Sequence, residues 1–235
     1  MKLSECLTKL SYGEFSNLSL GSDGNGDIAP AKIHSTVMHI NEALLRLHTR
    51  MVLKENYVYL EQRENLTMYD LTYKHAATNE DPSNLEDRYI MDTEARPFTA
   101  DVLRIMQVTD SFGRNLPLND QGKFWSVYTP KFNQLQVPNP LGAQVLTVHY
   151  QAKHAKLDYD LNPDAEIEIP DTLDAALMSY VAYKVYGNMN TAEAVTNAAN
   201  HLGNYETVLT EIEKMDAANM SYINTSTLFD LKGFV

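Results

Sequence analysis

The segment from Asp171 to Met215 has the most regular hydrophobic pattern of the chain, and this pattern predicts two helices joined by a short turn. Asp171 follows Pro170 and is suited to cap the first helix, while Asp174 adds favourable charge to its first turn. Gly187 and Asn188 tolerate positive φ, so we expect this helix to end there. Its apolar residues are spaced to lie on one face: Leu173, Ala176, Leu177, Tyr180, Val181 and Val185.

A second helix is predicted to begin at Asn190, with Glu193 three residues later as the partner in a capping box. The short turn makes the two helices antiparallel neighbours. Apolar residues of the second helix alternate between spacings of three and four, as in a helix that packs along another helix. They are Val195, Ala198, Leu202, Tyr205, Leu209 and Ile212.

The same alternating spacing occurs from Pro30 to Lys54, which we expect to be the longest helix. Its seam consists of Ile33, Val37, Ile40, Leu44, Leu47 and Met51, widened by Met38, Leu45 and Val52. A short helix from Ser4 to Leu10, capped by Ser4, is predicted before it, with Leu3, Leu7 and Leu10 on one face. Together these patterns predict a helical body made from both ends of the chain.

Residues 56–153 have a different texture, rich in Tyr, Val, Leu and Thr with rough alternation, which favours strands. We expect a strand from Asp101, a turn at Ser111 to Gly113, and a second strand after it. Between His75 and Pro97 a polar segment predicts a long loop with one helical turn. Short spacing between strands predicts a meander or small barrel, with prolines at strand ends or edges.

The predicted fold class is therefore α+β, a helical bundle body with an inserted antiparallel β-rich region. The expected divisions are 1–55 for the N-terminal part of the body, 56–153 for the β-rich insertion, 154–170 for an acidic linker, 171–218 for the C-terminal helical hairpin and 219–235 for an extended arm. The arm has apolar residues without a helical period, as expected of a segment that orders on a partner.

The composition and the net charge exclude several classes of protein. The chain of 235 residues is 44% apolar and 21% charged, which is ordinary for a globular protein. No apolar run approaches the roughly 20 residues that span a bilayer, and Glu5, Thr8 and Lys9 interrupt any signal-peptide core, so a cytosolic chain is expected. The lone Cys6 excludes an internal disulfide. A net charge of −12 argues against a surface that grips nucleic acid by its phosphates.

Candidate metal sites are weak. Asp23, Asn25 and Asp27 imitate the start of an EF-hand loop, but Ile28 and His34 occupy positions that require Gly and Glu. Five carboxylates between residues 158 and 168 are better explained by a solvated strand end, with Ile167 and Ile169 inward and Glu166 and Glu168 in water. We therefore expect neither a metal ion nor another cofactor.

No enzyme motif is present either: the chain lacks G-x-S-x-G, a phosphate-cradling loop and a dinucleotide fingerprint. His34 and His39 are five residues apart and do not share a helix face, and nothing completes a site around His149 and His154. Trp125 and the fourteen tyrosines are best explained as packing or interface residues. A catalytic site assembled from distant residues stays open.

Five stretches resemble the head-to-tail adaptor (head-completion, tail-tubular gatekeeper-like) proteins of short-tailed double-stranded DNA phages. They are LSYGEFSNLSLG (10–21), DVLRIMQVTDSFGRNLPLND (101–120), VYTPKFNQLQVPNPLGAQVLTVHYQAKH (127–154), IPDTLDAALMSYVAYKVYGNMNTAEA (169–194) and TLFDLKGFV (227–235). The resemblance covers most of the chain and rests on order and texture, since no single motif is highly specific.

The resemblance implies a structural virion protein without catalysis, a ring, expected to be dodecameric, between the portal protein and the tail tube or nozzle protein. Double-stranded DNA would pass through its channel without sequence-specific binding, and a negative lumen would not hold the phosphates. No membrane partner is implied, and the expected location is the neck of the virion after assembly in the host cytoplasm.

Two groups of residues follow as candidate sites. The first is a portal-binding arm formed by Tyr222, Ile223, Leu228, Phe229, Phe234 and Val235. The second is a helix-packing or subunit interface formed by Ile40, Leu44, Leu47, Tyr180, Leu202, Tyr205 and Leu209. The rival functions are a small-ligand or carbohydrate-binding module in residues 56–153, which requires a concave aromatic pocket, and an enzyme, which requires titratable residues converging in one cleft.

Overall fold

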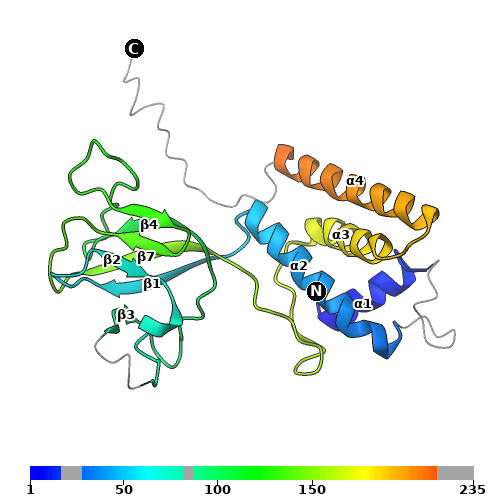
Figure 1. The fold of residues 1–235 in the computed structure, drawn as a ribbon, viewed down its shortest axis with the longest axis horizontal. Helices are drawn as coiled ribbons and strands as arrows, with labels where there is room; N and C mark the ends of the chain where they lie inside the picture. Colours follow the sequence, from blue (N-terminus) through cyan, green and yellow to red (C-terminus); the bar gives the residue numbers. More distant parts are fainter. Residues whose placement is uncertain (17–27, 82–86, 216–235) are drawn as a thin grey trace, which may run out of the picture.

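The structure of the protein is a computed structural model that describes residues 1–16, 28–81 and 87–215. Figure 1 shows two lobes side by side, which we call the helical lobe (residues 1–54 and 153–215) and the β-rich lobe (residues 55–152). Each lobe has its own hydrophobic core. The fold is therefore α+β, as the sequence predicts, with four α-helices and antiparallel sheets within the described residues.

Helix α1 (Leu3–Tyr12) buries Leu3, Leu7 and Leu10, as predicted. The predicted N-cap, Ser4, is wrong. Lys2 occupies the capping position, and the Glu5 carboxylate accepts the Lys2 backbone N–H at 3.4 Å. The Ser4 hydroxyl instead donates to Asp164 at 2.6 Å. Ser4 thus ties α1 to the distant acidic segment rather than to its own helix.

Helix α2 (Pro30–Arg50) ends four residues before the predicted Lys54. Met51 is extended, with φ −123° and ψ 147°, because the chain here turns toward the β-rich lobe. The seam from Val37 to Met51 is buried, and Ile33 is partly buried against the same core. Met38 and Leu45 do not widen the buried face as predicted, since both lie on the solvent side of the helix.

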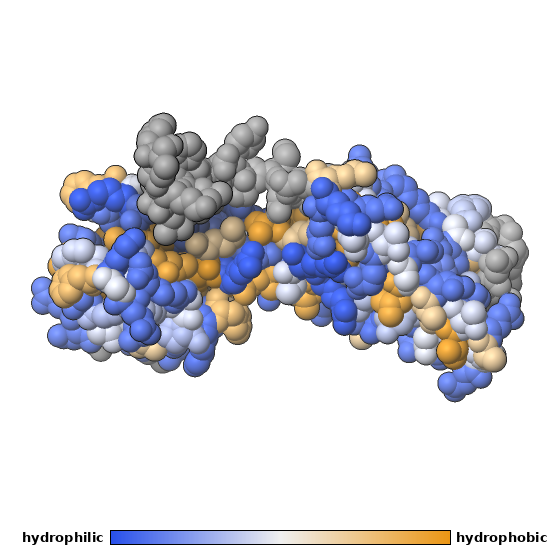
Figure 2. Space-filling view, turned by 90° about the horizontal axis from the view of Figure 1, so that it is seen from above, coloured by the Kyte–Doolittle hydropathy of each residue, from blue (hydrophilic) through white to orange (hydrophobic). Residues whose placement is uncertain are grey.

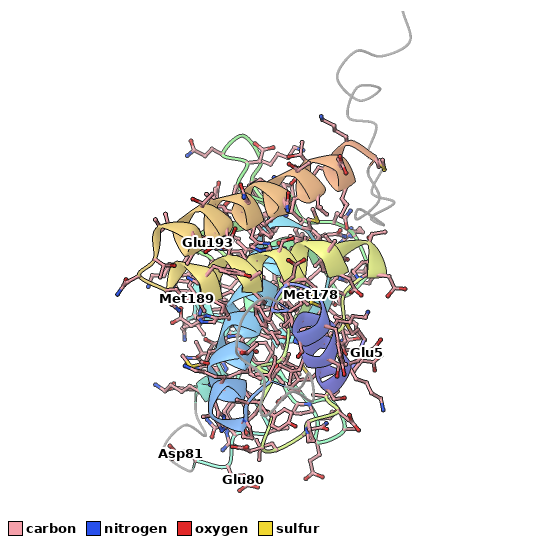
Figure 3. The ribbon with its side chains drawn as sticks, turned by 90° about the vertical axis from the view of Figure 1, so that its right-hand side faces the viewer. Glu5, Glu80, Asp81, Met178, Met189 and Glu193 are labelled. Carbon is pink, nitrogen blue, oxygen red and sulfur yellow. The ribbon has the colours of Figure 1, made fainter. Side chains whose placement is uncertain are left out.

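Helix α3 (Asp174–Gly187) lies between the other helices: Figure 3 shows α4 (Ala192–Met215) across one side of it and α2 and α1 on the other. The sequence predicts one apolar face for α3, but Met178, Ser179 and Ala182 are buried as well. A helix covered on opposite sides has little solvent face, which explains why its burial extends almost all round.

The predicted caps of α3 and α4 are wrong in detail. Asp171 lies in a 3₁₀ turn, η3 (Asp171–Leu173), so α3 begins after Leu173 and not at an aspartate cap. The helix does end at Gly187, yet Asn188 has φ −85° and no positive φ is involved. Before α4 it is the Thr191 hydroxyl, not Asn190, that accepts the Ala194 N–H, at 3.2 Å.

The buried face of α4 starts at Ala194, four residues before Ala198, and this turns the predicted seam residue Val195 toward solvent. Farther along, Tyr205, Leu209 and Ile212 are buried as predicted and Leu202 is partly buried. The rings of Tyr180 and Tyr205 meet at a centroid distance of 5.2 Å, so aromatic packing joins α3 to α4.

In the larger sheet of the β-rich lobe, the first strand of the lobe pairs with the last. It consists of β3 (Ile90–Met91), β1 (Glu55–Glu61), β7 (Val145–Ala152) and β4 (Val102–Thr109), in that order and antiparallel throughout. Val58, Val148 and Val108 are aligned across three strands and all buried. The predicted meander or small barrel is not found among the described strands, because the entering strand pairs with the leaving strand rather than with its neighbour in sequence, and the strands divide into two sheets.

The smaller sheet has the order β2 (Met68–Asp70), β6 (Gln134–Gln136) and β5 (Tyr128–Lys131), and a 3₁₀ turn, η1 (Tyr73–His75), follows β2. Pro130 lies in the edge strand β5, as expected for a proline. A turn does form at Gly113, with φ +76°, but the predicted second strand after it is reduced to isolated bridges at Asn115 and Leu118. Pro117 lacks a backbone N–H and so interrupts a ladder there.

Buried tyrosines of the β-rich lobe keep a partner for their hydroxyls. Tyr89 donates to the Asp70 carbonyl at 3.0 Å, and Tyr150 donates to the Asp101 carboxylate at 2.9 Å. Burial, followed for Tyr150 by the Asp101 charge, raises the pKa of both phenols. They are neutral packing residues, as the sequence predicts for most tyrosines.

The return segment from residue 153 to 170 packs along the N-terminus. Ile167 is buried while Glu166 and Glu168 are exposed, which confirms the predicted alternation. The Ile167 N–H donates to the Met1 carbonyl at 2.8 Å and the Leu3 N–H to the Ala165 carbonyl at 2.9 Å. The acidic residues therefore border a structured segment.

Leu44 and Leu45 give a matched test of the helical core, because they are neighbours on α2 and only Leu44 is buried. We expect Leu44→Ala to lower the free energy of unfolding by about 2–5 kcal/mol through lost burial and a cavity. Leu45→Ala carries the same change in helix propensity and should cost under about 1 kcal/mol. Urea unfolding followed by far-UV circular dichroism measures both, and equal losses would contradict the assigned core face.

Candidate functional site

The two lobes meet at a junction formed by the end of α2, residues 51–54, the end of β7 and residues 153–168. The side-chain amide of Gln151, 1% exposed, donates to the Met51 carbonyl at 2.9 Å and also to the His48 carbonyl. These carbonyls belong to the last turn of α2, where helical partners run out. One buried side chain thus ties the last strand of the β-rich lobe to the end of α2.

Further contacts close the same junction. The Ala152 N–H donates to the Lys54 carbonyl at 2.8 Å, and the Lys54 ammonium pairs with the Glu168 carboxylate at 2.8 Å. The hydrogen bond from Lys54 is the main reason that the pKa of Glu168 is lowered. Both chain crossings between the lobes are therefore bonded to each other.

Two histidines lie inside this junction, with ring centroids 5.6 Å apart in an edge arrangement. His154 Nε2 accepts the Glu168 N–H at 3.0 Å, so the proton of the neutral ring is on Nδ1, which donates to the Ala155 carbonyl at 2.6 Å. His48 is fully buried, and neither of its nitrogens has a hydrogen-bond partner among the described residues. Its pKa is lowered to about 4, first by burial and then by His154, against a smaller opposing effect of the Ala152 carbonyl.

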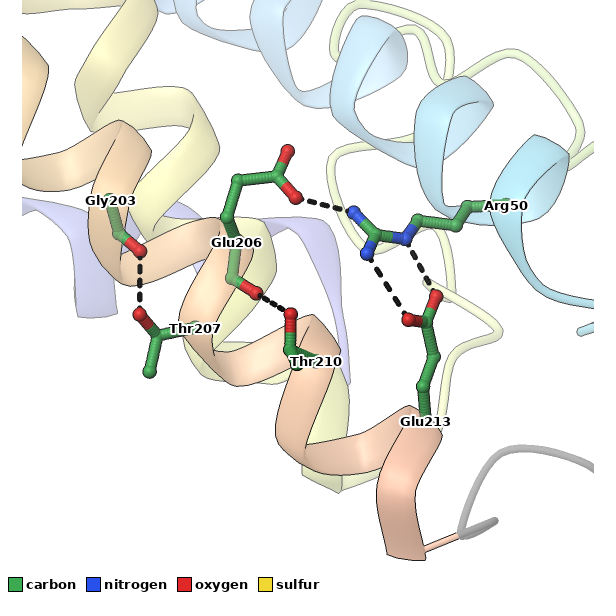
Figure 4. A network of polar contacts seen from close by, with 6 residues as sticks. All are labelled: Arg50, Gly203, Glu206, Thr207, Thr210 and Glu213. Carbon is green, nitrogen blue, oxygen red and sulfur yellow. Dashed lines mark hydrogen bonds and ion pairs between the residues drawn. The ribbon is translucent and has the colours of Figure 1, made fainter.

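A second set of polar contacts holds α4 to the end of α2, as Figure 4 shows. Arg50 donates from Nε to Glu213 at 2.7 Å and from Nη1 to Glu206 at 2.6 Å, and its Nη2 reaches Glu213 at 3.2 Å. The Glu213 and then the Glu206 carboxylates raise the pKa of Arg50. The C-terminal end of α4 is thereby fixed beside the junction, on the side of the helical lobe that faces the strands.

The far end of the β-rich lobe carries a cleft of about 640 Å³, which we call the distal cleft. It lies between the loops 110–127 and 137–146. Because β4 runs from Val102, paired with Ala152 at the junction, to Thr109, the loop that follows is about 25 Å from the helical lobe. Its apolar lining comes from Leu116, Pro117, Phe124, Trp125, Val127, Val137, Pro138, Leu141 and Leu146.

The loop that forms the cleft is held by its own polar contacts. The Asp110 carboxylate accepts the N–H groups of Phe112 and Arg114, each at 2.9 Å, and the Arg114 Nε at 2.8 Å. The Arg114 N–H is the main reason that the pKa of Asp110 is lowered. At the other end of the loop, the Ser126 hydroxyl accepts the Asp120 N–H and the Asn119 side-chain carbonyl accepts the Thr129 N–H. The distal cleft is therefore a shaped surface.

Of the two predicted groups of site residues, the structure describes only the helix-packing or subunit-interface group. Ile40, Leu44, Leu47, Tyr180, Tyr205 and Leu209 are buried in the core of the helical lobe, and Leu202 lies partly buried against it. All residues of the predicted arm lie outside the described residues. Asp23, Asn25 and Asp27 of the weak calcium motif also lie outside them.

The described residues contain no group of three or more His, Cys, Asp or Glu side chains placed to hold a metal ion. Cys6 is buried, and burial raises the pKa of its thiol to about 12, so it is not a reactive nucleophile. None of the described helices has the length and apolarity to cross a membrane.

Sequence reasoning missed the junction and the distal cleft. His48 falls on the apolar face of α2, four residues after Leu44, and a polar residue on such a face is a detectable signal. Gln151 sits in a strand and gives no comparable signal. Phe112, Phe124 and Trp125 are close in sequence among turn residues, which indicates exposed aromatic rings, but only the fold brings residues 137–146 opposite them.

The structure thus combines two lobes, a hydrogen-bonded junction between them and a cleft at the distal end of the β-rich lobe. The family model for the SU10 adaptor protein matches residues 14–226, and the chain belongs to this family. No curated protein matches the sequence. The family confirms the resemblance to phage head-to-tail adaptors that the sequence shows.

The buried His48 makes the junction sensitive to acid. Its pKa in the folded chain, about 4, lies below its ordinary value of 6.5. Below pH 6.5 the unfolded chain therefore binds a proton that the folded chain does not, so stability falls as the pH drops from 6.5 toward 4. The expected loss from this residue approaches about 3 kcal/mol near pH 4.

Urea unfolding at several pH values measures this effect in the wild-type chain, in His48→Leu and in His34→Leu, a control at an exposed histidine of the same helix. We expect His48→Leu to gain stability relative to the wild type as the pH falls, and the control to follow the wild type. A constant difference between His48→Leu and the wild type across this range contradicts the assignment.

Proposed function

We propose that the chain is the subunit of a head-to-tail adaptor ring in a phage neck, joining the portal protein to the tail. The observation that carries this proposal is the family match over residues 14–226, which covers both lobes and the junction. The chain belongs to a family of phage adaptor proteins, and we propose that it is a structural protein without catalytic activity. The ring, its proposed dodecameric order and its DNA channel are our extension of that finding.

The two-lobed shape supports different binding partners for the two lobes. We propose that the helical body (1–55 and 171–218) faces the portal and neighbouring subunits, while the β-rich insertion (56–153) faces the tail tube or nozzle protein. The linker 154–170 belongs to the junction. Because Gln151, Lys54 and Glu168 bond the two crossings of the chain, the distance between the two faces is set by the fold rather than by partners.

The hydropathy and the charge of the chain are compatible with the proposed position in an adaptor ring around a DNA channel. On the face seen in Figure 2, both lobes are largely hydrophilic, and apolar residues gather on the β-rich lobe and at the waist between the lobes. The net charge of −12, repeated around a ring, gives a channel that does not hold DNA phosphates if the acidic residues face the lumen. A basic lumen in a map of the assembled ring would contradict this arrangement.

The proposed arm, residues 219–235, binds the portal through its apolar side chains: Tyr222, Ile223, Leu228, Phe229, Phe234 and Val235. We propose that neither hydrophobic core depends on this arm, because its apolar side chains have no helical period. Deletion of Ser221 to Val235 should therefore leave thermal unfolding nearly unchanged and abolish binding to portal rings.

Sedimentation with and without portal rings measures this, together with negative-stain images of any adaptor ring. The matched control replaces Ser221, Thr225 and Thr227 by Ala and keeps the apolar residues. Unchanged portal binding by the deletion would refute the arm. A wild-type chain that never joins a portal ring would refute the adaptor function itself.

The distal cleft supports a second candidate, a small-ligand or carbohydrate-binding module, because that function requires a concave aromatic surface. Phe124 and Trp125 form such a surface, with ring centroids 5.0 Å apart. A glycan-binding screen of the isolated chain separates the two functions: specific binding that is lost in Trp125→Ala favours the module.

The location that follows from the main proposal is the virion neck, after assembly in the host cytoplasm.

A further inference from the structure

The loop 110–127 at the distal end of the β-rich lobe carries three exposed aromatic rings, Phe112, Phe124 and Trp125. Among the described residues, Phe15 and Phe98 are buried, whereas Phe112, Phe124 and Phe132 are 76%, 71% and 63% exposed. Trp125, the one tryptophan of the sequence, is 52% exposed. Clustered exposed aromatic side chains are typical of contact surfaces, because solvent exposure of such rings is unfavourable.

The distal cleft has the form of a receptor for large apolar side chains. Its volume of about 640 Å³ lies within the range of ligand sites, and its walls are mostly apolar. The loop that carries Phe124 and Trp125 is fixed by the Asp110 and Ser126 hydrogen bonds, so little order has to be gained on binding.

The remaining two phenylalanines of the sequence, Phe229 and Phe234, follow the last residue of α4. Arg50 holds Glu213 beside the junction, and the end of α4 faces the β-rich lobe (Figure 1). Phe229 is fourteen residues beyond Met215 and can therefore lie up to ~46 Å from it. The distal cleft lies about 25 Å beyond the junction along β4, which is within this reach.

We propose that residues 216–235 of the same chain occupy the distal cleft in the free subunit, with Leu228 and Phe229 as the anchoring side chains. A tether of this length gives an effective concentration on the order of millimolar, so even a contact with a Kd near ~1 mM is substantially occupied. A second copy of the chain reaches that concentration only in very concentrated solution.

This docking has a consequence that rests on the proposed adaptor function. The same apolar side chains then serve two partners in turn, the chain's own cleft before assembly and the portal afterwards. Docking shields both the arm and the aromatic cleft until a portal ring displaces the arm. Displacement uncovers the cleft at the distal end, where the next tail component is proposed to bind.

Trp125 reports directly on the occupant of the cleft, because it is the one tryptophan and lies in the cleft wall. We compare the wild-type chain with the double variant Leu228→Asp, Phe229→Asp. The control variant Ser226→Asp, Thr227→Asp adds the same charge at the two preceding positions and keeps both apolar side chains. Both variants change residues beyond Met215, the last described residue, and circular dichroism verifies the fold.

The expected result is a red-shifted Trp125 emission and a several-fold rise in acrylamide quenching in the Leu228/Phe229 variant, with the control close to the wild type. Addition of excess synthetic peptide with the sequence of residues 216–235 should reverse the shift. Identical emission and quenching in all three chains would overturn the proposal. A signal that depends on protein concentration would also overturn it, since the occupant would then be the arm of a second copy.

The outcomes separate this inference from the adaptor function. Portal binding by the wild-type chain without any change of Trp125 fluorescence in the variants supports the adaptor and removes the docking. A clear fluorescence change in a chain that never joins a portal ring supports the docking and removes the adaptor. Trp125→Phe, which keeps an aromatic wall, verifies that the signal arises in the cleft.

Discussion

The antiparallel pairing of β1 with β7 is the contact on which the rest of the structure depends. It joins residues 55–61 to residues 145–151, so the strand that enters the β-rich lobe lies beside the strand that leaves it. The two crossings between the lobes are consequently neighbours. Gln151, at the end of this pairing, then reaches the last turn of α2 and satisfies carbonyls that the helix leaves without partners.

This arrangement explains why the junction has an unusual polar content. Two crossings side by side bring the ends of a helix and a strand together, and their backbone groups need partners in a buried place. Gln151 donates to the Met51 and His48 carbonyls, the Lys54 carbonyl accepts the Ala152 N–H, and His154 Nε2 accepts the Glu168 N–H. His48 is the exception, since it is buried without a hydrogen bond among the described residues and stays neutral over most of the physiological range.

Helix prediction from the sequence succeeded where local spacing decides the outcome. The seam of α2 from Val37 to Met51 and the buried face of α4 at Tyr205, Leu209 and Ile212 follow from period alone. Strand pairing was wrong because it depends on contacts more than eighty residues apart, such as Val58 with Val148, which leave no local signal. The aromatic residues near Trp125 were visible in the sequence, whereas the opposite wall of their cleft was not.

The helical core combines residues from both ends of the described chain, from Leu3 in α1 to Ile212 in α4. Within the described part of the chain, the β-rich core draws only on residues 58–152. During synthesis, all strands of the β-rich core therefore leave the ribosome before α3 and α4 do. Until α3 and α4 follow, the apolar faces of α1 and α2 that pack against them are uncovered. We therefore expect the helical lobe to complete its fold last, with the apolar faces of α1 and α2 exposed to solvent and chaperones in that interval.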